Sequence, residues 1–368
     1  MHHLRESLLS PTPKGTTELI TRESASRDAE HVRTAAARGE FEDLRDDAFF
    51  NRTWVVSDRY CNVGDGVDSL EEYLHSLWHI YYQLGRYTSH ETADHDRLVL
   101  DILRIQGKGP LTRPVPWLYG NDRIDIARTV KGTLWNDPPF LVADMTDFWV
   151  NNCASMSGFQ RLNFASFLAK LASTRVSKDR ICQVDLVLFR TTFEVGRDLR
   201  TTGEPDDEDP RRCLRQLDIA HLLPSACTWI KEAGVNLIQL SDVCWNDCPG
   251  TVGQGGQAFI ESELGRRSPT GFTPWRWMYW LKRLHEIREE ATEAKEERLE
   301  EYATDAIERM VSNVEERNSE ILRAYHAGGD VLLQDKHLLC LKTLVQSETP
   351  AEDDDDKTPV EDDDDNEV

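Results

Sequence analysis

The 368-residue chain is predicted to be all-α, a multi-helix array or orthogonal bundle with a Gly-rich loop and a long C-terminal helix or helical hairpin. Apolar residues recur at helical spacing along most of its length, and no convincing run alternates apolar and polar residues as strands require. The chain is 39% hydrophobic and 30% charged, which is typical of a globular protein rather than a disordered one.

The chain is expected to form one long body between two tails. Residues 1–34 are polar and predicted to be mostly disordered, and residues 346–368 form a disordered acidic tail. Residues 35–345 form the helical domain, which is either one helical array or two closely packed subdomains. The tail is a tandem repeat, TPAEDDDDK followed by TPVEDDDDN, and such a charge block has no apolar surface to bury.

The first helices of the body are predicted from apolar spacing. In residues 69–87 the apolar stripe is Leu74, Leu77, Trp78 and Tyr81, with Asp68 and Ser69 as possible caps. A second helix is expected over 97–105, ended by Gly107 and Gly109. Residues 110–119 contain three prolines and are predicted to be a loop.

Three further helices have recognisable starts. Asp137–Pro138 is typical of an N-cap followed by proline at the first helical position. Ser157 is expected to cap a helix over 158–173 that is apolar nearly all round and therefore buried. Ser177 is expected to begin another helix, which ends near Gly196.

The remaining body is expected to hold an insertion and two helical blocks. Residues 197–212, with two prolines and a run of acids from Asp206 to Asp209, are predicted to be an exposed, solvated insertion. Residues 218–241 follow as a helical stretch with breaks at Pro224 and Gly234. The C-terminal block starts at Thr273–Pro274 and stops at Gly328–Gly329, as one helix of about 50 residues or two with a break near Thr304.

Charge and cysteine content restrict the class of function. The formal charge is −23, of which residues 346–368 carry −11, so −12 remains on the rest. A negative body repels phosphate backbones, so broad nucleic-acid binding is not expected. No uncharged run is long enough to span a membrane, and no export signal opens the chain, so a cytoplasmic or nuclear protein with reduced cysteines is expected.

One histidine pair is a candidate metal site. His75 and His79 lie four residues apart and share one helix face, but a third ligand has to come from elsewhere, with His90, Asp94 and His95 as candidates. Ordinary surface or core histidines are the favoured interpretation, so no metal site is predicted. No cofactor is predicted either, because the Gly-rich segment PGTVGQGGQ lacks the lysine of a phosphate-binding loop.

The long connection at 245–273 is the candidate binding segment, because long connections are usually functional or disordered. It places aromatic residues beside arginines and glycines, which is typical of a recognition surface. A structural plug across helix ends is the alternative interpretation, and catalytic residues remain unassigned. The candidate ligand- or partner-binding residues are Trp245, Asp247, Gln254, Gln257, Glu261, Arg266, Arg276 and Trp277.

Three segments resemble an uncharacterised fungal family known only as a domain of unknown function, DUF3632. They are LWNDPPFLVADMTDFWV (134–150), SGFQRLNFASFLAKLASTR (157–175) and WNDCPGTVGQGGQAFIESELGRRSPTGFTPWRWMYWLKRL (245–284). The resemblance implies a filamentous-fungal origin, an intracellular location and a largely helical body over 45–345. It implies no activity and no catalytic residues.

Two functions follow as hypotheses. The first is an intracellular helical scaffold or regulatory module that binds another protein, with the acidic tail attracting a basic partner. The second is an enzyme or small-ligand binder whose pocket lies between helices and is lined by residues 245–276. A flat surface around that loop favours the first hypothesis, and a closed pocket with a perturbed carboxylate favours the second.

Overall fold

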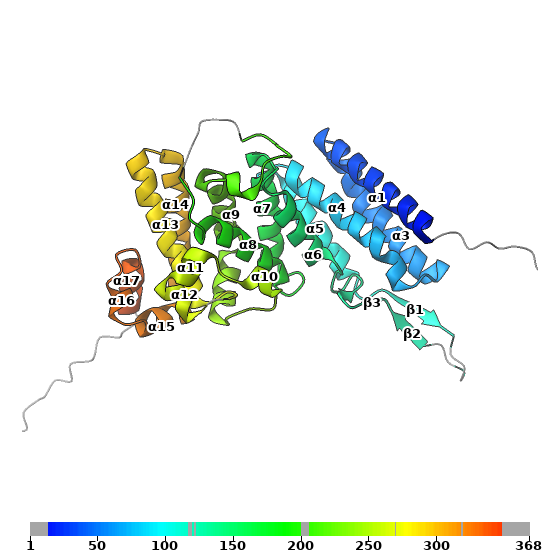
Figure 1. Ribbon diagram of the computed structural model, residues 1–368. Helices are drawn as coiled ribbons and strands as arrows, with labels where there is room; N and C mark the ends of the chain where they lie inside the picture. The colour runs from blue at the N-terminus through cyan, green and yellow to red at the C-terminus, as the bar shows by residue number, and fades with distance from the viewer. Residues whose placement is uncertain are drawn as a thin grey trace, which may run out of the picture.

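The computed structural model describes residues 14–116, 120, 123–199, 206–268, 270–317 and 319–347, and most of them are helical. The all-α fold class is therefore confirmed. Figure 1 shows an elongated body in which the helices follow chain order, with α1–α3 and the β1–β2 pair at one end and α13–α17 at the other.

The elements have the following bounds. The α-helices are α1 Lys14–Ala37, α2 Phe41–Asp46, α3 Thr53–Asp58, α4 Glu71–Tyr87, α5 Ala93–Gly107, α6 Leu141–Asn152, α7 Gly158–Ser173, α8 Gln183–Phe193, α9 Ile219–Asp242, α10 Gly250–Gly253, α11 Gln257–Glu261, α12 Glu263–Arg267, α13 Pro274–Ala294, α14 Glu297–Glu315, α15 Glu320–Ala327, α16 Asp330–Leu333 and α17 Leu339–Ser347. The π-helical turns are η1 Asp47–Arg52 and η2 Arg59–Val63, and the 3-10 turns are η3 Val67–Leu70, η4 Arg180–Cys182 and η5 Leu214–Gln216. The strands are β1 Thr112–Val115, β2 Arg123–Ile126, β3 Arg128–Thr129 and β4 Gly132–Thr133.

One hydrophobic core runs through the body. Its buried side chains extend from Val32 in α1 to Leu341 in α17. Helix α7 packs between α4 and α9, α9 packs against α14, and α14 packs against α13. Because α7 has neighbours on several sides, its apolar residues are buried around most of its circumference, as its sequence predicted.

Several predicted helices are confirmed. The Ser157 hydroxyl accepts a hydrogen bond from the Gln160 amide at 3.2 Å, and the Gln160 side chain accepts one from the Ser157 amide, which is a complete capping box. The resulting helix covers the predicted residues 158–173. Helix α4 matches the prediction for 69–87, although Leu70 caps it and no side chain does. Helix α5 contains the predicted 97–105.

The predicted start at Asp137–Pro138 is wrong. Helix α6 begins at Leu141, and Phe140, with a left-handed φ of 66°, precedes it. Asp137 does not cap the helix, because its carboxylate accepts a hydrogen bond from Arg180 at 2.5 Å.

The predicted helix start at Ser177 is also wrong. Ser177 and its neighbours take positive φ values, and the helix starts only at Gln183, after turn η4.

Helix α9 is unbroken at Pro224 and Gly234, where breaks were predicted. Asp218 caps it by accepting from the His221 amide at 3.2 Å, and Pro224 lies near this end, so the helix continues past the one missing N–H. Gly234 serves packing instead of breaking the helix. A Cβ there would lie 2.6 Å from the side-chain nitrogen of Asn313 in α14.

Two short strand pairs depart from the expectation of no strands. β1, which lies inside the predicted loop 110–119, pairs antiparallel with β2, and β3 pairs with β4. Pro114 lies in β1, opposite Ile124. Proline is tolerated there because each strand of a two-stranded pair keeps one edge without a partner.

The two ends of the chain also differ from the expectation. Of the segment predicted to be mostly disordered, residues 14–34 lie in helix α1. The C-terminal block breaks at Lys295, with a left-handed φ of 60°, and Thr304 lies inside α14. The acidic repeat at 349–366 lies outside the described residues.

The described part of the acidic segment 197–212 is tied to the body. Asp206 accepts from Arg161 at 2.8 Å and from Arg212 at 2.7 Å, and Arg161 is fully buried. Glu208 forms an ion pair with Arg86 at 3.1 Å. The interpretation of Asp206–Asp209 as a solvated charge run is therefore wrong for these two acids.

Candidate functional site

The predicted binding loop folds back on itself between α9 and α13. The Gly271 amide donates to the Gly253 carbonyl at 2.8 Å, and the Phe272 amide donates to the Trp245 carbonyl at 2.9 Å. Gly271 has a φ of +72°, and a Cβ there would lie 2.5 Å from the Trp245 carbonyl oxygen. Only glycine fits this crossing, which accounts for one glycine of the Gly-rich segment.

Arg276 holds the loop in place through hydrogen bonds to its backbone carbonyls. It lies in the first turn of α13, where the Thr273 hydroxyl caps the helix and Pro274 takes the first position, as predicted. Its Nη1 donates to the Gly253 carbonyl at 2.8 Å and to the Gly271 carbonyl at 2.9 Å. Nε donates to Glu194 at 2.7 Å. Both side chains of this ion pair are fully buried.

The partner Glu194 is itself well satisfied. Besides Arg276, it accepts from the Trp280 indole N–H at 2.7 Å and from the Gly256 amide at 2.6 Å. A buried ion pair is tolerated when such additional hydrogen bonds satisfy it. The arrangement therefore fixes the loop to α8 and α13 and leaves no free charge at Arg276.

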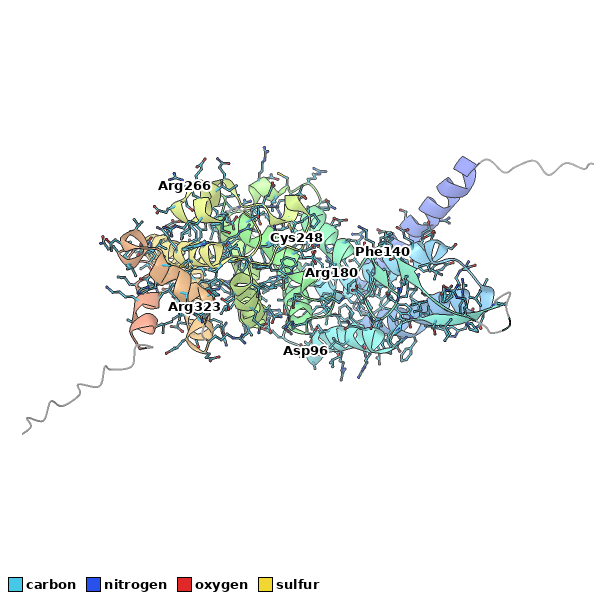
Figure 2. The ribbon with its side chains drawn as sticks, turned by 90° about the horizontal axis from the view of Figure 1, so that it is seen from below. Asp96, Phe140, Arg180, Cys248, Arg266 and Arg323 are labelled. Carbon is cyan, nitrogen blue, oxygen red and sulfur yellow. The ribbon has the colours of Figure 1, made fainter. Side chains whose placement is uncertain are left out.

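The eight predicted residues separate into an inner and an outer set. Arg276 and Trp277 are buried, and Trp245 is half-buried with its ring 5.9 Å from that of Phe272. The other five side chains are exposed, and they are Asp247, Gln254, Gln257, Glu261 and Arg266. Among the outer set, Gln257 donates to Glu261. In Figure 2, Arg266 lies at the edge of the body opposite Asp96.

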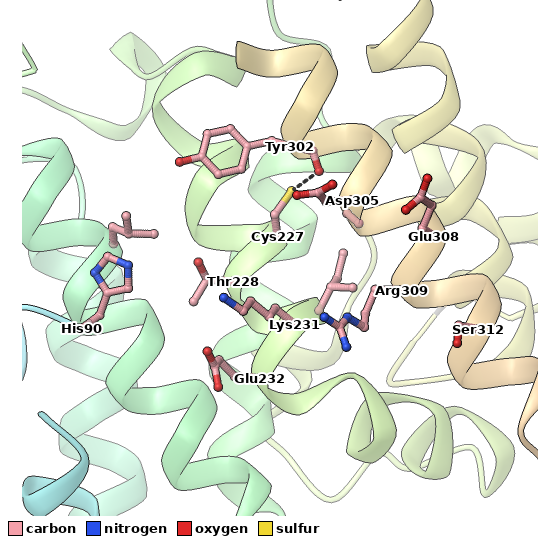
Figure 3. A pocket seen from close by; sticks show the side chains of 13 residues that line it. His90, Cys227, Thr228, Lys231, Glu232, Tyr302, Asp305, Glu308, Arg309 and Ser312 are labelled. Atoms are coloured by element: carbon pink, nitrogen blue, oxygen red, sulfur yellow. Dashed lines mark hydrogen bonds between the residues drawn. The ribbon is translucent and has the colours of Figure 1, made fainter. Parts of the chain in front are cut away.

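A groove of about 550 Å³ lies elsewhere, over α9 and against α14. Figure 3 shows Thr228, Lys231 and Glu232 on α9, with His90 on one side and Arg309 of α14 on the other. None of the described residues of 245–276 lines this groove. Acids and bases alternate along it, so its charge points to no single class of ligand.

A second cavity, of about 350 Å³, lies between α1, α4 and α6, and we call it the α4–α6 pocket. Its lining combines four carboxylates, two histidines and an aromatic ring. The lining residues are Asp28, Ala29, Glu72, His75, Ser76, His79, Asp144, Asp147 and Phe148. The histidine pair singled out in the sequence therefore does share a cavity, with acids from α1 and α6 as its neighbours.

His75 is held between two acids. Its Nδ1 lies 2.7 Å from Asp144 Oδ2, and its Nε2 lies 3.5 Å from Glu71 Oε1. The hydrogen bond with Asp144 raises the pKa of His75, and burial raises the pKa of Asp144. The proton between His75 and Asp144 is therefore retained to higher pH than it would be on an isolated imidazole or an isolated carboxyl group.

His79 and Asp28 have the opposite character. Burial lowers the pKa of His79 to about 4, so its ring is neutral at physiological pH. Burial alone would raise the pKa of Asp28, but hydrogen bonds from Arg52 and Ser76 bring it below its ordinary value. Asp28 is thus an anion already paired with Arg52, at 2.9 Å.

The candidate third metal ligands do not join His75 and His79. His90 lies 3.0 Å from the Asn163 side chain, and His95 Nε2 lies 3.1 Å from the Asn163 carbonyl, both against α7. In the described part of the chain, no group of three or more His, Cys, Asp or Glu residues is placed to hold a metal ion. All eight cysteines are unpaired, and they divide among buried, half-buried and exposed positions.

Sequence reasoning missed Glu194, Asp28 and Asp144 as site residues. Glu194 is 82 residues from its partner Arg276, and Asp144 is 69 residues from His75, so no local pattern joins them. One signal was available for Asp144. It lies with Asp147 and Phe148 in the segment 134–150 that carries the family resemblance.

The fold and its cavities define a helical protein with ligand-sized hollows at its surface. Within the described residues, no helix is both long enough and apolar enough to cross a membrane. The chain belongs to the DUF3632 family of proteins of unknown function, whose model matches residues 78–284. This confirms the family that the sequence resembles.

One curated relative extends the comparison to almost the whole chain. It is "Oxopyrrolidines biosynthesis cluster protein G" of Penicillium oxalicum (strain 114-2 / CGMCC 5302), 57% identical over 344 residues, which cover 94% of this chain and 95% of the relative. The relative is fungal, as the resemblance implied. No solved structure matches the chain.

Proposed function

We propose that this chain is a helical protein-binding module that serves a fungal biosynthetic cluster, in the cytoplasm or nucleus. The name of the relative supports the cluster assignment, since the two chains are 57% identical over nearly their full lengths. The observation that carries the binding role is the loop at 245–273. Arg276 fixes its backbone from the buried side, and its exposed side chains are mostly polar.

The anchored loop has the properties of a preformed binding surface. Arg276 fixes the backbone at Gly253 and Gly271, so a partner does not have to order it on binding. The exposed Gln257, Glu261 and Arg266 supply polar contacts, and Ile260, 41% exposed, lies among them as an apolar contact. Neither the groove nor the α4–α6 pocket is lined by this loop, which argues against the enzyme pocket proposed for it.

The test is a comparison of two charge-matched double variants. Glu261→Ala/Arg266→Ala removes one acid and one base from the loop surface, and Glu297→Ala/Arg298→Ala does the same on α14. Tagged chains are purified from the host fungus, and co-purified proteins are identified by mass spectrometry. We expect the loop variant to lose a partner that the wild type and the α14 variant retain, with all melting temperatures equal.

The outcome that contradicts the binding role is the same set of proteins on all three chains. The cluster assignment has its own test, which is deletion of the gene followed by metabolite profiling, and an unchanged profile contradicts it.

The role of the acidic tail is tested by removing residues 348–368. If the tail attracts a basic partner, capture weakens and loses its dependence on salt.

A further inference from the structure

We propose that the α4–α6 pocket binds a small organic cation, an amine that also carries an apolar group. This goes beyond the proposed function, because the pocket is separate from the loop at 245–273 and does not depend on a protein partner.

The first argument is charge that has no partner within the protein. Four carboxylates line the pocket, and they come from three different helices. Asp28 is paired with Arg52, and Asp144 with His75. Within the described residues, the side chains of Glu72 and Asp147, which are both exposed, form no hydrogen bond or ion pair. An ammonium group beside either carboxylate would gain an opposite charge without breaking a contact that the protein already makes.

The basic side chains near the pocket are either paired with acids of the protein or neutral. Arg52 is held by Asp28 at 2.9 Å and by Asp47 at 3.0 Å. His75 lies between Asp144 and Glu71, and His79 is neutral because burial lowers its pKa to about 4. The groups that face the pocket from α1, α4 and α6 therefore leave a net negative hollow, which excludes an anionic ligand.

The second argument is an aromatic wall held in place. The Phe148 ring is stacked on Tyr82, with centroids 4.4 Å apart and planes 17° apart, so its orientation is fixed by packing. Ala29 of α1 adds a second apolar contact. A ring fixed beside carboxylates suits an ammonium group, through cation–π attraction, and suits an attached hydrocarbon group equally well.

The third argument is positioning by a strained residue. Phe140 takes a left-handed φ of 66°, and its ring lies 4.6 Å from that of His75. Non-glycine residues in this region are strained and cluster at functional sites. Here the Phe140 ring packs against His75 and restricts the imidazole that pairs with Asp144.

The test uses three phenyl compounds that differ in charge: a cation, a neutral molecule and an anion. Isothermal titration at pH 7 compares 2-phenylethylamine with the neutral 2-phenylethanol and the anion phenylacetate. We expect saturable binding of the amine, at least about tenfold weaker binding of the alcohol and none of the acid. Asp147→Asn and Glu72→Gln should each weaken the amine severalfold, and Phe148→Leu should weaken it as well.

The control is Glu42→Gln, which removes an exposed acid of α2 outside the pocket and should leave amine binding unchanged. Melting temperatures establish that each variant is folded. The proposal is overturned if the amine does not bind at about 10 mM, if the alcohol binds as tightly as the amine, or if neither Asp147→Asn nor Glu72→Gln weakens the amine in folded protein.

Discussion

Asp185 in α8 is fully buried, and neither of its carboxylate oxygens has a hydrogen-bond partner within the described residues. Burial raises its pKa well above the ordinary value, and the nearby Glu194 raises it further, against the opposing effect of Arg276. A carboxyl in this position stays protonated in the folded protein at pH values where the unfolded chain ionises it. Its contribution to stability is therefore present at low pH and is lost as the pH rises.

Asp185→Asn should remove this pH dependence, because the amide cannot ionise. We expect the variant to be more stable than the wild type at about pH 8, by more than about 1 kcal/mol, with the difference shrinking toward pH 4. Urea unfolding at several pH values measures it, with the exposed Asp43→Asn as the control. A stability difference that does not change with pH would mean that Asp185 is ionised in the fold.

The Arg276–Glu194 pair predicts strong coupling between two residues far apart in the chain. Either Arg276→Met or Glu194→Gln leaves one buried group without its partner, so each should cost about 3–5 kcal/mol of unfolding free energy. The double variant should cost at least about 1 kcal/mol less than the sum of the single variants. Urea unfolding of the four proteins measures the coupling, and additive losses would refute it.

Arg97→Met is the matched control for that cycle. Arg97 pairs with Asp94 at 2.5 Å on the surface of α5, so its loss should cost less than about 1 kcal/mol. The contrast shows what the sequence did and did not predict at this scale. The sequence singled out Arg276 as a candidate binding residue beside a Gly-rich loop, but its partner and its burial depend on packing that no local pattern records.

At the scale of helices, two buried glycines predict opposite results. A Cβ on Gly85 of α4 would lie 2.9 Å from the ring of Phe167 in α7, and that ring is fully buried. A Cβ on Gly234 of α9 would meet only the terminal amide of Asn313, at 2.6 Å, and that half-buried side chain has room to turn. The first neighbour is rigid, and the second is flexible.

Gly85→Ala should therefore destabilise the protein by about 1–3 kcal/mol, since overpacking outweighs the better helix propensity of alanine. Gly234→Ala should be neutral or stabilising by up to about 1 kcal/mol, because alanine favours the helix and Asn313 moves aside. Thermal unfolding of both variants, with circular dichroism at 222 nm, decides between these signs. Equal destabilisation by both would contradict the account of packing.

Helix boundaries were predictable where residues close together in the sequence determine them. Ser157 and Gln160 are three residues apart and form their box without help, so α7 was predicted at its true ends. Asp137 carries an equally strong local signal, but Arg180 takes its carboxylate and the helix starts at Leu141. Tertiary contacts of this kind override local signals, and they account for the missed starts.

The whole molecule raises a question that periodicity alone left open, namely one helical array or two subdomains. A body of this length often divides, because single cores stop growing near 250–300 residues. Here one cluster of buried apolar side chains is continuous from Val32 to Leu341. The packing of α4 on α7, α7 on α9 and α9 on α14 joins its two ends.

This continuity predicts that residues 35–345 unfold as one cooperative unit. Buried tryptophans report on both ends, with Trp78 and Trp149 in α4 and α6, and Trp229 and Trp280 in α9 and α13. In urea, tryptophan fluorescence and circular dichroism should therefore give the same midpoint and one transition. A fluorescence transition that precedes the loss of helix would instead divide the body into two subdomains. Hydrogen exchange measured at the intermediate urea concentration would then place the boundary.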